Sequence, residues 1–429
     1  MSESKETLSA DLRWRGLIYQ TSDDAVATLI DAGEAVAYIG FDPTSDSLHV
    51  GNLIQLLNLR RLQLGGNRPI TVAGGATGMV GDPSGKSAER NLLDREVLAY
   101  NVERIKVQLA QIIDFDAGSS SAKLVNNADW LGEVALLDFL RDIGKHVTVN
   151  QMIAKDSVRT RLSEREHGIS YTEFSYMLLQ ATDYLHLYDN YACNLQMGAS
   201  DQWGNITIGI DLIRRARGAH VHGMTSPLLL KPDGTKFGKS EAGAIYLDPE
   251  KTSPYDFYQF FLRSEDAVVI QYLKFFTFLK AEEIDALEVA LSEKPELRLA
   301  QHALASELTA LIHGSQGLEL ARQASEALFS TEILSMDARA INMALAGAPV
   351  YIVEGATLSA GIGVVDVLAA SALVKSRSEA RKLISQGGIY LNNSRVHEAS
   401  ALLSSGDLLP GGKILLRKGK KDYLAITVT

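Results

Sequence analysis

The sequence predicts an α/β protein that begins with a parallel sheet and continues with a helical part and a small α+β part. Residues 35–41 and 69–73 are apolar and β-prone, and each segment ends in a turn rich in proline or glycine. From residue 254 to about residue 330 the apolar side chains recur at helical spacing instead. The first part of the chain therefore supplies the strand ends at which α/β proteins usually bind ligands.

The first strand leads directly into a helix, and this junction is the strongest candidate for a binding site. Pro43 ends the strand, and leucines recur at helical spacing from Leu48 onward. His49, Gly51 and Asn52 then fall in the first helical turn, where unpaired backbone N–H groups favour a phosphate. An imidazole there can donate to a phosphate oxygen, and a glycine lets a ligand approach the backbone closely.

A second glycine-rich turn, GGATGMVGDPSGKS, follows the second strand. A phosphate-binding P-loop requires glycine five residues before Gly85, and Val80 occupies that position. This departure argues against a P-loop nucleotide hydrolase. What remains is a ligand-binding turn at the carboxyl end of a strand, and it presents Asp82 and Lys86.

A long helix in the middle of the chain carries polar side chains on one face. Tyr176, Gln180 and Asp183 are spaced by four and three residues, so they share that face. They could form the wet side of a surface helix, but their apolar neighbours favour partial burial, which would require hydrogen-bond partners. The next predicted strand ends near Asp201 and Gln202, which extend the candidate site.

Composition and charge restrict the classes of protein. The chain has 429 residues, enough for two or three domains, and no apolar run approaches the ~18 residues of a membrane span. Its first residues lack the apolar segment of a secretory signal, which predicts a cytoplasmic protein. A single cysteine, Cys193, excludes an internal disulfide and a cysteine-built zinc site.

The charge is distributed unevenly along the chain. The formal net charge is −10, but residues 361–429 hold ten basic and five acidic side chains, which leaves −15 for the residues before them. A basic tail on an acidic body predicts an RNA-binding module, although a solvated basic surface would look the same.

Two motifs resemble the signatures of class I aminoacyl-tRNA synthetases. Pro43-Thr44 followed by His49-Val50-Gly51-Asn52 is similar to the His-Ile-Gly-His motif, with Asn52 in place of the second histidine. Lys236-Phe237-Gly238-Lys239-Ser240 is similar to the Lys-Met-Ser-Lys-Ser loop. The helix bearing Tyr176, the Gly81–Gly85 turn and a C-terminal stretch similar to an S-four-type RNA-binding module point to the tyrosine-specific branch.

The resemblance implies a domain order as well as a fold. We expect the following parts: a Rossmann-like catalytic domain at 1–248, with a connective insertion at about 125–195 and the lysine loop at 236–240; a helical domain at 249–335; a linker at 336–360; and an S-four-type RNA-binding domain at 361–429. The insertion would also form the surface of a homodimer.

The activity implied by the resemblance is ligation of L-tyrosine to tRNA(Tyr) through tyrosyl-adenylate, with ATP as substrate and Mg²⁺ carried by ATP rather than by a protein metal site. The residues implied to bind tyrosine are Tyr38, Asp82, Tyr176, Gln180, Asp183 and Gln202. Those implied to bind ATP are Gly40, Asp42, Thr44, His49, Gly51, Lys86, Asp201, Lys236 and Lys239. Those implied in catalysis are Thr44, His49, Asn52, Lys236 and Lys239. Those implied to contact tRNA are Arg214, Arg215, Arg381 and Lys382.

Two alternatives stay open at this point. A tryptophanyl-type synthetase shares the catalytic fold, but it has no use for a phenol-binding pair and lacks the S-four-type tail. A non-catalytic RNA-binding protein that retains the synthetase fold is the second alternative. Such a protein should have lost His49 or the two lysines, and both motifs are present.

Overall fold

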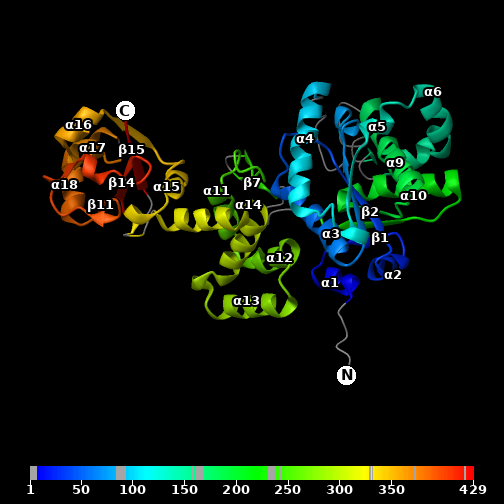
Figure 1. Cartoon of the computed structure of the whole chain (residues 1–429), viewed down its shortest axis with the longest axis horizontal. Coiled ribbons are helices and arrows are strands. Elements are labelled where there is room, and N and C mark those ends of the chain that lie inside the picture. The colour runs from blue at the N-terminus through cyan, green and yellow to red at the C-terminus, as the bar shows by residue number, and fades with distance from the viewer. Residues whose placement is uncertain are drawn as a thin grey trace. The chain divides into compact units, whose positions relative to one another are not determined.

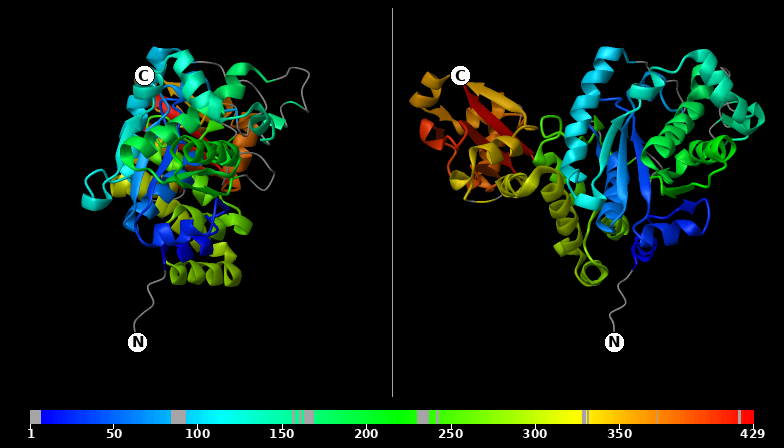
Figure 2. Two further views of the ribbon diagram at one scale, coloured as in Figure 1. Left: turned by 90° about the vertical axis from the view of Figure 1, so that its right-hand side faces the viewer. Right: turned by 45° about the vertical axis from the view of Figure 1, so that its right-hand side comes forward.

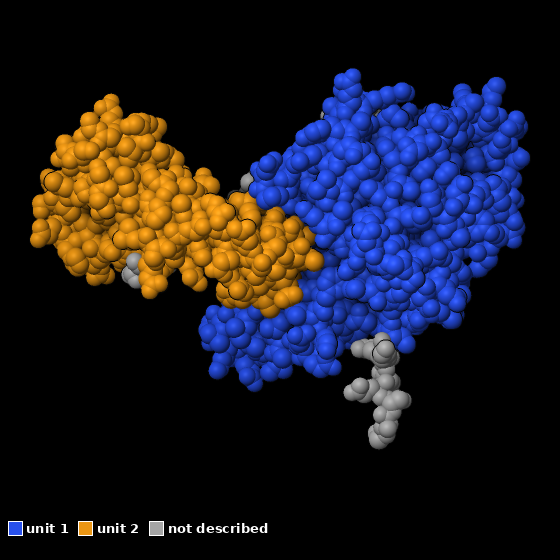
Figure 3. Space-filling model, in the orientation of Figure 1, with its two compact units in different colours: residues 1–251, 265–300 blue, residues 252–264, 301–429 orange. Residues whose placement is uncertain are grey.

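The structure is a computed structural model that describes residues 7–83, 93–155, 158–159, 162, 169–229, 237–240, 243–327, 330, 332–371, 373–419 and 422–429. The chain divides into two compact units, coloured separately in Figure 3. Unit 1 comprises residues 1–251 and 265–300, and unit 2 comprises residues 252–264 and 301–429. Within the described residues, none of the helices has the length and apolar character to cross a membrane.

Unit 1 is built on a six-stranded sheet with the strand order β1-β6-β5-β2-β3-β4. Its strands are β1 (Gln20–Thr21), β2 (Val36–Phe41), β3 (Arg68–Ala73), β4 (Lys123–Asn126), β5 (Leu195–Ala199) and β6 (His222–Ser226). All neighbouring pairs are parallel except β1 and β6, which are antiparallel. The prediction of an α/β fold with a parallel sheet is confirmed.

Helices cover both faces of this sheet (Figures 1 and 2). On one side lie α3 (Leu53–Leu64) and α4 (Arg95–Ile112), and on the other lie α9 (Tyr171–Tyr191) and α10 (Trp203–Arg217). Alternate residues of β2 face opposite sides of the sheet, so Val36 and Tyr38 pack in one core cluster with Met177 and Tyr184 of α9. The strand order reverses between β2 and β5, which places a crevice at their carboxyl ends.

The remaining elements complete unit 1. They are α1 (Leu8–Trp14), α2 (Ala25–Asp31), η1 (Val50–Asn52), η2 (Thr77–Met79), η3 (Gly118–Ser120), α5 (Ala128–Leu131), α6 (Leu136–Asp138), η4 (Phe139–Ile143), η5 (Gly144–His146), α7 (Val149–Ile153), η6 (Ser200–Gln202), β7 (Lys239–Ser240), β8 (Gly243–Ala244), α12 (Asp266–Phe276), α13 (Ala281–Glu293) and η7 (Pro295–Leu297). The part of the insertion between β4 and α9 that the structure describes is thus a series of short helical turns.

Two buried arginines hold the end of α12 in unit 1. Arg15 donates hydrogen bonds to the carbonyls of Lys274, Thr277 and Leu279 at 3.2, 3.1 and 2.7 Å. Arg61 donates to the carbonyls of Phe275 and Thr277 at 2.9 and 2.8 Å. These carbonyls lie at a helix C-terminus, where a positive charge is favourable. Burial, reinforced by the neighbouring Arg15, lowers the pKa of Arg61 to about 9.

Unit 2 combines helices with a five-stranded sheet of order β12-β11-β14-β15-β9 and a two-stranded β10-β13 ladder. Its elements are α11 (Pro254–Leu262), α14 (Leu299–Ala327, which begins two residues before the unit), η8 (Ile333–Ser335), α15 (Ala338–Ala344), β9 (Val350–Val353), α16 (Gly355–Ala360), β10 (Ile362–Gly363), α17 (Val364–Ala370), α18 (Arg377–Ser385), β11 (Ile389–Leu391), β12 (Ser394–Arg395), β13 (Leu402–Leu403), η9 (Ser405–Asp407), β14 (Lys413–Lys418) and β15 (Asp422–Val428).

This division differs from the expected boundaries at 248, 335 and 360. The end of α14 and helix α15 share a core cluster with Leu415 of β14 and Ala425 of β15. The expected linker contributes β9, which pairs in parallel with β15. Asn393 also donates to the carbonyl of Ala327 at 2.7 Å. The later helices therefore pack with the C-terminal sheet, whereas α12 and α13 pack with unit 1.

Candidate active site

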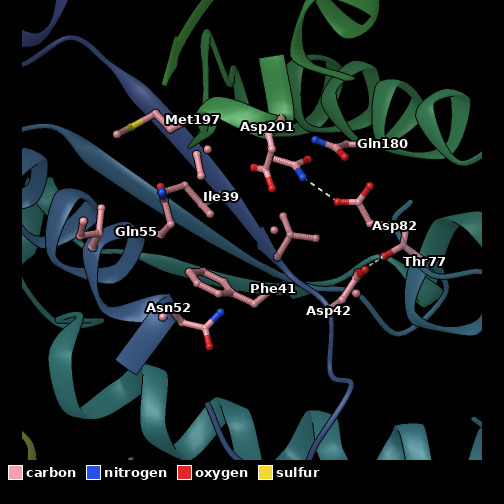
Figure 4. Close-up of a pocket in the computed structure, with 18 of the residues that line it drawn as sticks. Ile39, Phe41, Asp42, Asn52, Gln55, Thr77, Asp82, Gln180, Met197 and Asp201 are labelled. Carbon is pink, nitrogen blue, oxygen red and sulfur yellow. Dashed lines mark hydrogen bonds between the residues drawn. The ribbon is translucent and has the colours of Figure 1, made fainter. Parts of the chain in front are cut away.

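The carboxyl ends of β2, β3 and β5 surround a cavity of about 660 Å³ (Figure 4). The structure brings together here thirteen of the residues selected from sequence, namely Tyr38, Gly40, Asp42, Thr44, His49, Gly51, Asn52, Asp82, Tyr176, Gln180, Asp183, Asp201 and Gln202. They come from strand ends, from the start of η1 and from one face of α9, as the strand order and the helical spacing predict.

The other selected residues lie elsewhere or outside the described part. Lys86 and Lys236 fall outside the described residues, and the backbone of Lys239 lies in β7. Arg214 and Arg215 are exposed at the end of α10 and do not line the cavity. Arg381 and Lys382 are exposed on α18 of unit 2.

His49 and Asn52 form a reciprocal cap at the start of η1. The Nδ1 atom of His49 accepts a hydrogen bond from the backbone N–H of Gly51 at 3.1 Å. The Oδ1 atom of Asn52 accepts from the backbone N–H of His49 at 3.1 Å. Since Nδ1 is an acceptor, the neutral imidazole carries its proton on Nε2 and can donate it. Asn52 therefore orients the backbone of His49, which gives this departure from the two-histidine motif a physical role.

The lysine loop lies against this cap through its glycine. Gly238 has φ = +89°, and a Cβ placed on it would lie 2.8 Å from Val50 Cγ2 and 3.2 Å from the backbone nitrogen of Gly51. The backbone N–H of Val50 donates to the carbonyl of Ile245 at 2.9 Å, and that of Ile245 donates to the carbonyl of Gly238 at 2.9 Å. The two motifs therefore meet by backbone contact that only a glycine permits.

Asp183 lies at the buried end of the cavity. Its carboxylate accepts hydrogen bonds from Trp130 Nε1 at 2.8 Å and from Asn127 Nδ2 at 3.0 Å. Burial raises the pKa of the Asp183 carboxyl to about 7, although these two bonds favour the ionised form. Burial and the neighbouring Asp183 also raise the pKa of Tyr38, whose hydroxyl donates to the carbonyl of Gln180 at 3.4 Å. The buried end thus holds a phenol, a carboxyl group and few charges.

Asp42 belongs to a chain of hydrogen bonds across the cavity wall. Tyr176 Oη donates to Asp42 Oδ2 at 3.1 Å, and Thr77 Oγ1 donates to Asp42 Oδ1 at 2.8 Å. Asn127 Nδ2 donates in turn to Thr77 Oγ1 at 2.9 Å. Burial, followed by the nearby charge of Asp42, raises the pKa of Tyr176 well above its ordinary value. The hydroxyl of Tyr176 is therefore a donor at neutral pH.

A second chain of hydrogen bonds joins Asp82 to α9. Gln202 Nε2 donates to Asp82 Oδ2 at 2.6 Å, the dashed line at Asp82 in Figure 4. Asn205 Nδ2 donates to Gln202 Oε1 at 3.2 Å and to Gln180 Oε1 at 2.9 Å. These side chains form a polar wall with one carboxylate, which can bind a cationic group.

Sequence reasoning missed Thr77, Asn127, Trp130 and Asn205. Asn127 and Trp130 hold Asp183, and Thr77 holds Asp42. The signal that could have revealed Asn127 is its position one residue after β4, because polar side chains after parallel strands gather at the ligand-binding edge. Trp130 gave no comparable signal, since a tryptophan is usually part of the core.

Comparison with known proteins decides the family. The family described as tRNA synthetases class I (W and Y) matches residues 31–330, and the tyrosine–tRNA ligase SYY-like C-terminal domain matches residues 341–426. A tyrosine–tRNA ligase of Opitutus terrae is 53% identical over 98% of this chain and 100% of its own length. The chain belongs to the class I tyrosyl-tRNA synthetases. Its function is that of a tyrosine–tRNA ligase, the activity that the resemblance implied.

Other relatives agree with this family. A tyrosine–tRNA ligase of Bacillus caldotenax is 49% identical over 98% of this chain and 99% of its own. A C-terminally truncated mitochondrial tyrosyl-tRNA synthetase of Aspergillus nidulans has a TM-score of 0.67 at 32% identity, covering 76% of this chain and 95% of that one. A tryptophanyl-tRNA synthetase of Encephalitozoon cuniculi, at 15% identity and a TM-score of 0.52, shares the fold alone.

Proposed function

We propose that this cavity binds L-tyrosine and ATP side by side, forms tyrosyl-adenylate and then transfers the tyrosyl group to the 3′ end of tRNA(Tyr). The observation that carries the proposal is the contact between Gly238 of the lysine loop and the backbone at Gly51. This contact supports a role for the loop's lysines beside the helix start that carries His49. A triphosphate held there would have its α-phosphorus directed toward the buried tyrosine pocket.

The buried end supplies tyrosine specificity. Asp183 would accept a hydrogen bond from the phenolic hydroxyl of the substrate, and Tyr38 would form a second hydrogen bond with the same hydroxyl. Phenylalanine has no hydroxyl, so Asp183 and Tyr38 would both lose this partner, at a cost of about 1–3 kcal/mol for each unsatisfied group. Asp82, Tyr176, Gln180 and Gln202 would hold the ammonium and carboxylate of the amino acid, with the charge of Asp82 as the strongest attraction.

The first reaction step needs no general base. The tyrosine carboxylate is already ionised at neutral pH, and it attacks the α-phosphorus while pyrophosphate leaves. Catalysis then rests on holding the reactants in line and on donors directed at the charge that develops on the phosphates. His49 Nε2 and the lysine loop would provide these donors, and Asn52 would keep the backbone of His49 in place.

The nucleotide would lie along the cavity mouth. Gly40 and Gly51 would let the nucleotide approach the backbone closely. Asp42 and Asp201 would position the ribose. The phosphates would contact the remaining predicted residues, which are Thr44, His49, Lys86, Lys236 and Lys239. Mg²⁺ would enter with ATP, bound by phosphate oxygens and water. Asp42 and Asp82 both accept hydrogen bonds from protein side chains of the cavity wall. This supports binding of Mg²⁺ by ATP rather than by these two carboxylates.

We also propose that the chain forms a homodimer through the insertion between β4 and α9. Several large apolar side chains are exposed there, including Leu136 at 69%, Leu137 at 77% and Val149 at 57%. Clusters of this kind on a protein surface mark interaction sites. A cytoplasmic location stays a prediction, as does contact of Arg214 and Arg215 with tRNA.

Tyrosine-dependent exchange of pyrophosphate into ATP tests the proposed function. The enzyme should catalyse exchange with tyrosine and not with tryptophan. His49→Ala and Lys239→Ala should each slow exchange by about 100-fold or more while the tyrosine Kd stays within about twofold, because a transition-state contact lowers the rate without affecting ground-state binding. Lys294→Ala, which changes an exposed lysine outside the cavity, is the control. Equal losses in rate and tyrosine binding would contradict the assigned roles.

A further inference from the structure

Asp23, His220 and His222 form a cluster of metal-ligating side chains outside the cavity. One ligand atom of each lies within 4.8 Å of the others, and no second group of this kind occurs among the described residues. His222 Nδ1 is 2.9 Å from Asp23 Oδ2, and His220 Nε2 is 3.4 Å from the same oxygen. The two imidazole rings are nearly perpendicular, with centroids 4.9 Å apart. The three side chains therefore converge on one point.

The backbone that carries two of these ligands is fixed by the sheet. His222 is the first residue of β6, and Asp23 follows β1, which pairs with β6. Ser22 donates its backbone N–H to the carbonyl of Gly223 at 2.9 Å and accepts the N–H of Gly223 through its hydroxyl at 3.0 Å. Tyr184 donates to the carbonyl of His222 at 2.8 Å. These bonds fix the backbone positions of Asp23 and His222 relative to each other.

The distances and donor types suit a zinc ion. Ligands about 2.0–2.1 Å from Zn²⁺ in a tetrahedron are separated by about 3.3 Å, close to the His220–Asp23 distance of 3.4 Å. Imidazole nitrogen and carboxylate oxygen are both ordinary zinc ligands. Two imidazoles and one carboxylate, with a fourth position left for water, match the ligand set of open zinc sites.

We propose that Asp23, His220 and His222 bind one Zn²⁺ ion, with water in the fourth position. The side chain of His220 is 70% exposed, which leaves that position open to solvent. The site lies at the amino end of β6, while the residues just after its carboxyl end, Pro227 to Leu229, line the cavity. The five residues of β6 span roughly 13 Å, so the ion stabilises the β1–β6 edge and takes no part in tyrosine activation.

Zinc binding to the full chain tests the proposal. The protein is stripped with EDTA, dialysed and titrated with Zn²⁺ by equilibrium dialysis, and Co²⁺ replaces Zn²⁺ to give a visible absorption spectrum of tetrahedral type. The wild-type chain should bind about one ion, and His220→Gln and Asp23→Asn should bind it at least about tenfold more weakly. His397→Gln, at an exposed histidine of unit 2, should bind like the wild type.

Two outcomes would overturn the proposal. One is the absence of stoichiometric Zn²⁺ binding by the wild type, which would mean that Asp23 and His222 only pair with each other. The other is unchanged binding in His220→Gln and Asp23→Asn, which would place the ion elsewhere. Tyrosine-dependent exchange should be the same in His220→Gln as in the wild type. An active variant is folded, so its weaker Zn²⁺ binding would reflect the lost ligand. Because exchange and Zn²⁺ binding are measured separately, a failure of the proposed catalytic roles would not affect this test.

Discussion

The protonation state of Asp183 connects burial to substrate choice. A buried carboxyl group pays for the loss of water, and here the donors Asn127 and Trp130 only partly restore the ionised form, leaving a pKa of about 7. Below that pH the group is largely protonated and one oxygen no longer accepts. Above it, each oxygen retains an unused lone pair for the phenol of tyrosine.

Tyrosine binding should accordingly strengthen as pH rises through about 7. The ionised Asp183 offers the phenol two acceptor oxygens and a negative charge, whereas the protonated form offers one neutral acceptor, so the affinity should increase by up to about tenfold between pH 6 and pH 8 and then level off. Measuring the tyrosine Kd by calorimetry over this range checks the prediction. Asp183→Asn should bind weakly with a flat profile, whereas a slope that persists in this variant would assign the titration to another group.

Spacing and the family resemblance predicted many residues that line the cavity but not the side chains that hold them. Tyr176, Gln180 and Asp183 could be found because their spacing defines a helix face. Asn127 and Trp130 lie in a loop and a one-turn helix, and no local pattern reveals that the end of β4 adjoins α9. That proximity depends on strand order, which is a property of the folded sheet.

At the scale of elements, the contact between the lysine loop and η1 determines the geometry of the phosphate site. Gly238→Ala should slow pyrophosphate exchange by about 100-fold and leave the tyrosine Kd unchanged, because the added Cβ would clash with Val50 and displace the loop. Exchange rates with tyrosine binding measured in parallel check this prediction.

Gly243→Ala is a matched control for that variant. Gly243 also has a positive φ of +116°, but nothing lies within 4 Å of a Cβ placed there. Both substitutions therefore introduce backbone strain, and only one introduces a clash with η1. Similar losses in the two variants would mean that strain, rather than contact with the helix start, explains the effect.

Element types followed from the sequence more readily than their packing partners. Helical periodicity correctly indicated helices beyond residue 254, but it gave no information about the surface against which each one packs. The carbonyl contacts of Arg15 and Arg61 assign α12 to unit 1, and the core shared with β14 assigns the end of α14 to unit 2. These are contacts between residues far apart in sequence.

At the scale of the whole molecule, the exposed apolar surface of the insertion predicts self-association. Leu136→Glu combined with Leu137→Glu should weaken the dimer by about 100-fold or more, since two exposed leucines lose about 1.5–3 kcal/mol each as buried contacts. Sedimentation velocity across protein concentrations measures this. Leu297→Glu, at a site 49% exposed outside the insertion, should sediment like the wild type.

The basic C-terminal part predicts salt-dependent binding of tRNA. Arg381→Ala combined with Lys382→Ala should weaken tRNA binding and reduce the slope of log affinity against log salt by about two, because two phosphate contacts are lost. Filter binding at several salt concentrations measures the slope. Tyrosine-dependent exchange should be unaffected, and a loss of exchange would show that these residues act on the catalytic cavity instead.

Arg15 and Arg61, which donate hydrogen bonds to the end of α12, limit how the enzyme can be truncated. A shortened chain that stops at residue 251 would keep both guanidinium groups but remove all the carbonyls to which they donate. Such a fragment would retain only the pair of Arg15 with Asp11 and the bond from Arg61 to Asn58, and the loss of every carbonyl partner should make it less stable than the full chain. A stable version of unit 1 alone has to join residue 251 to residue 265 and end near residue 300. It therefore requires an internal deletion of residues 252–264 in addition to a C-terminal truncation.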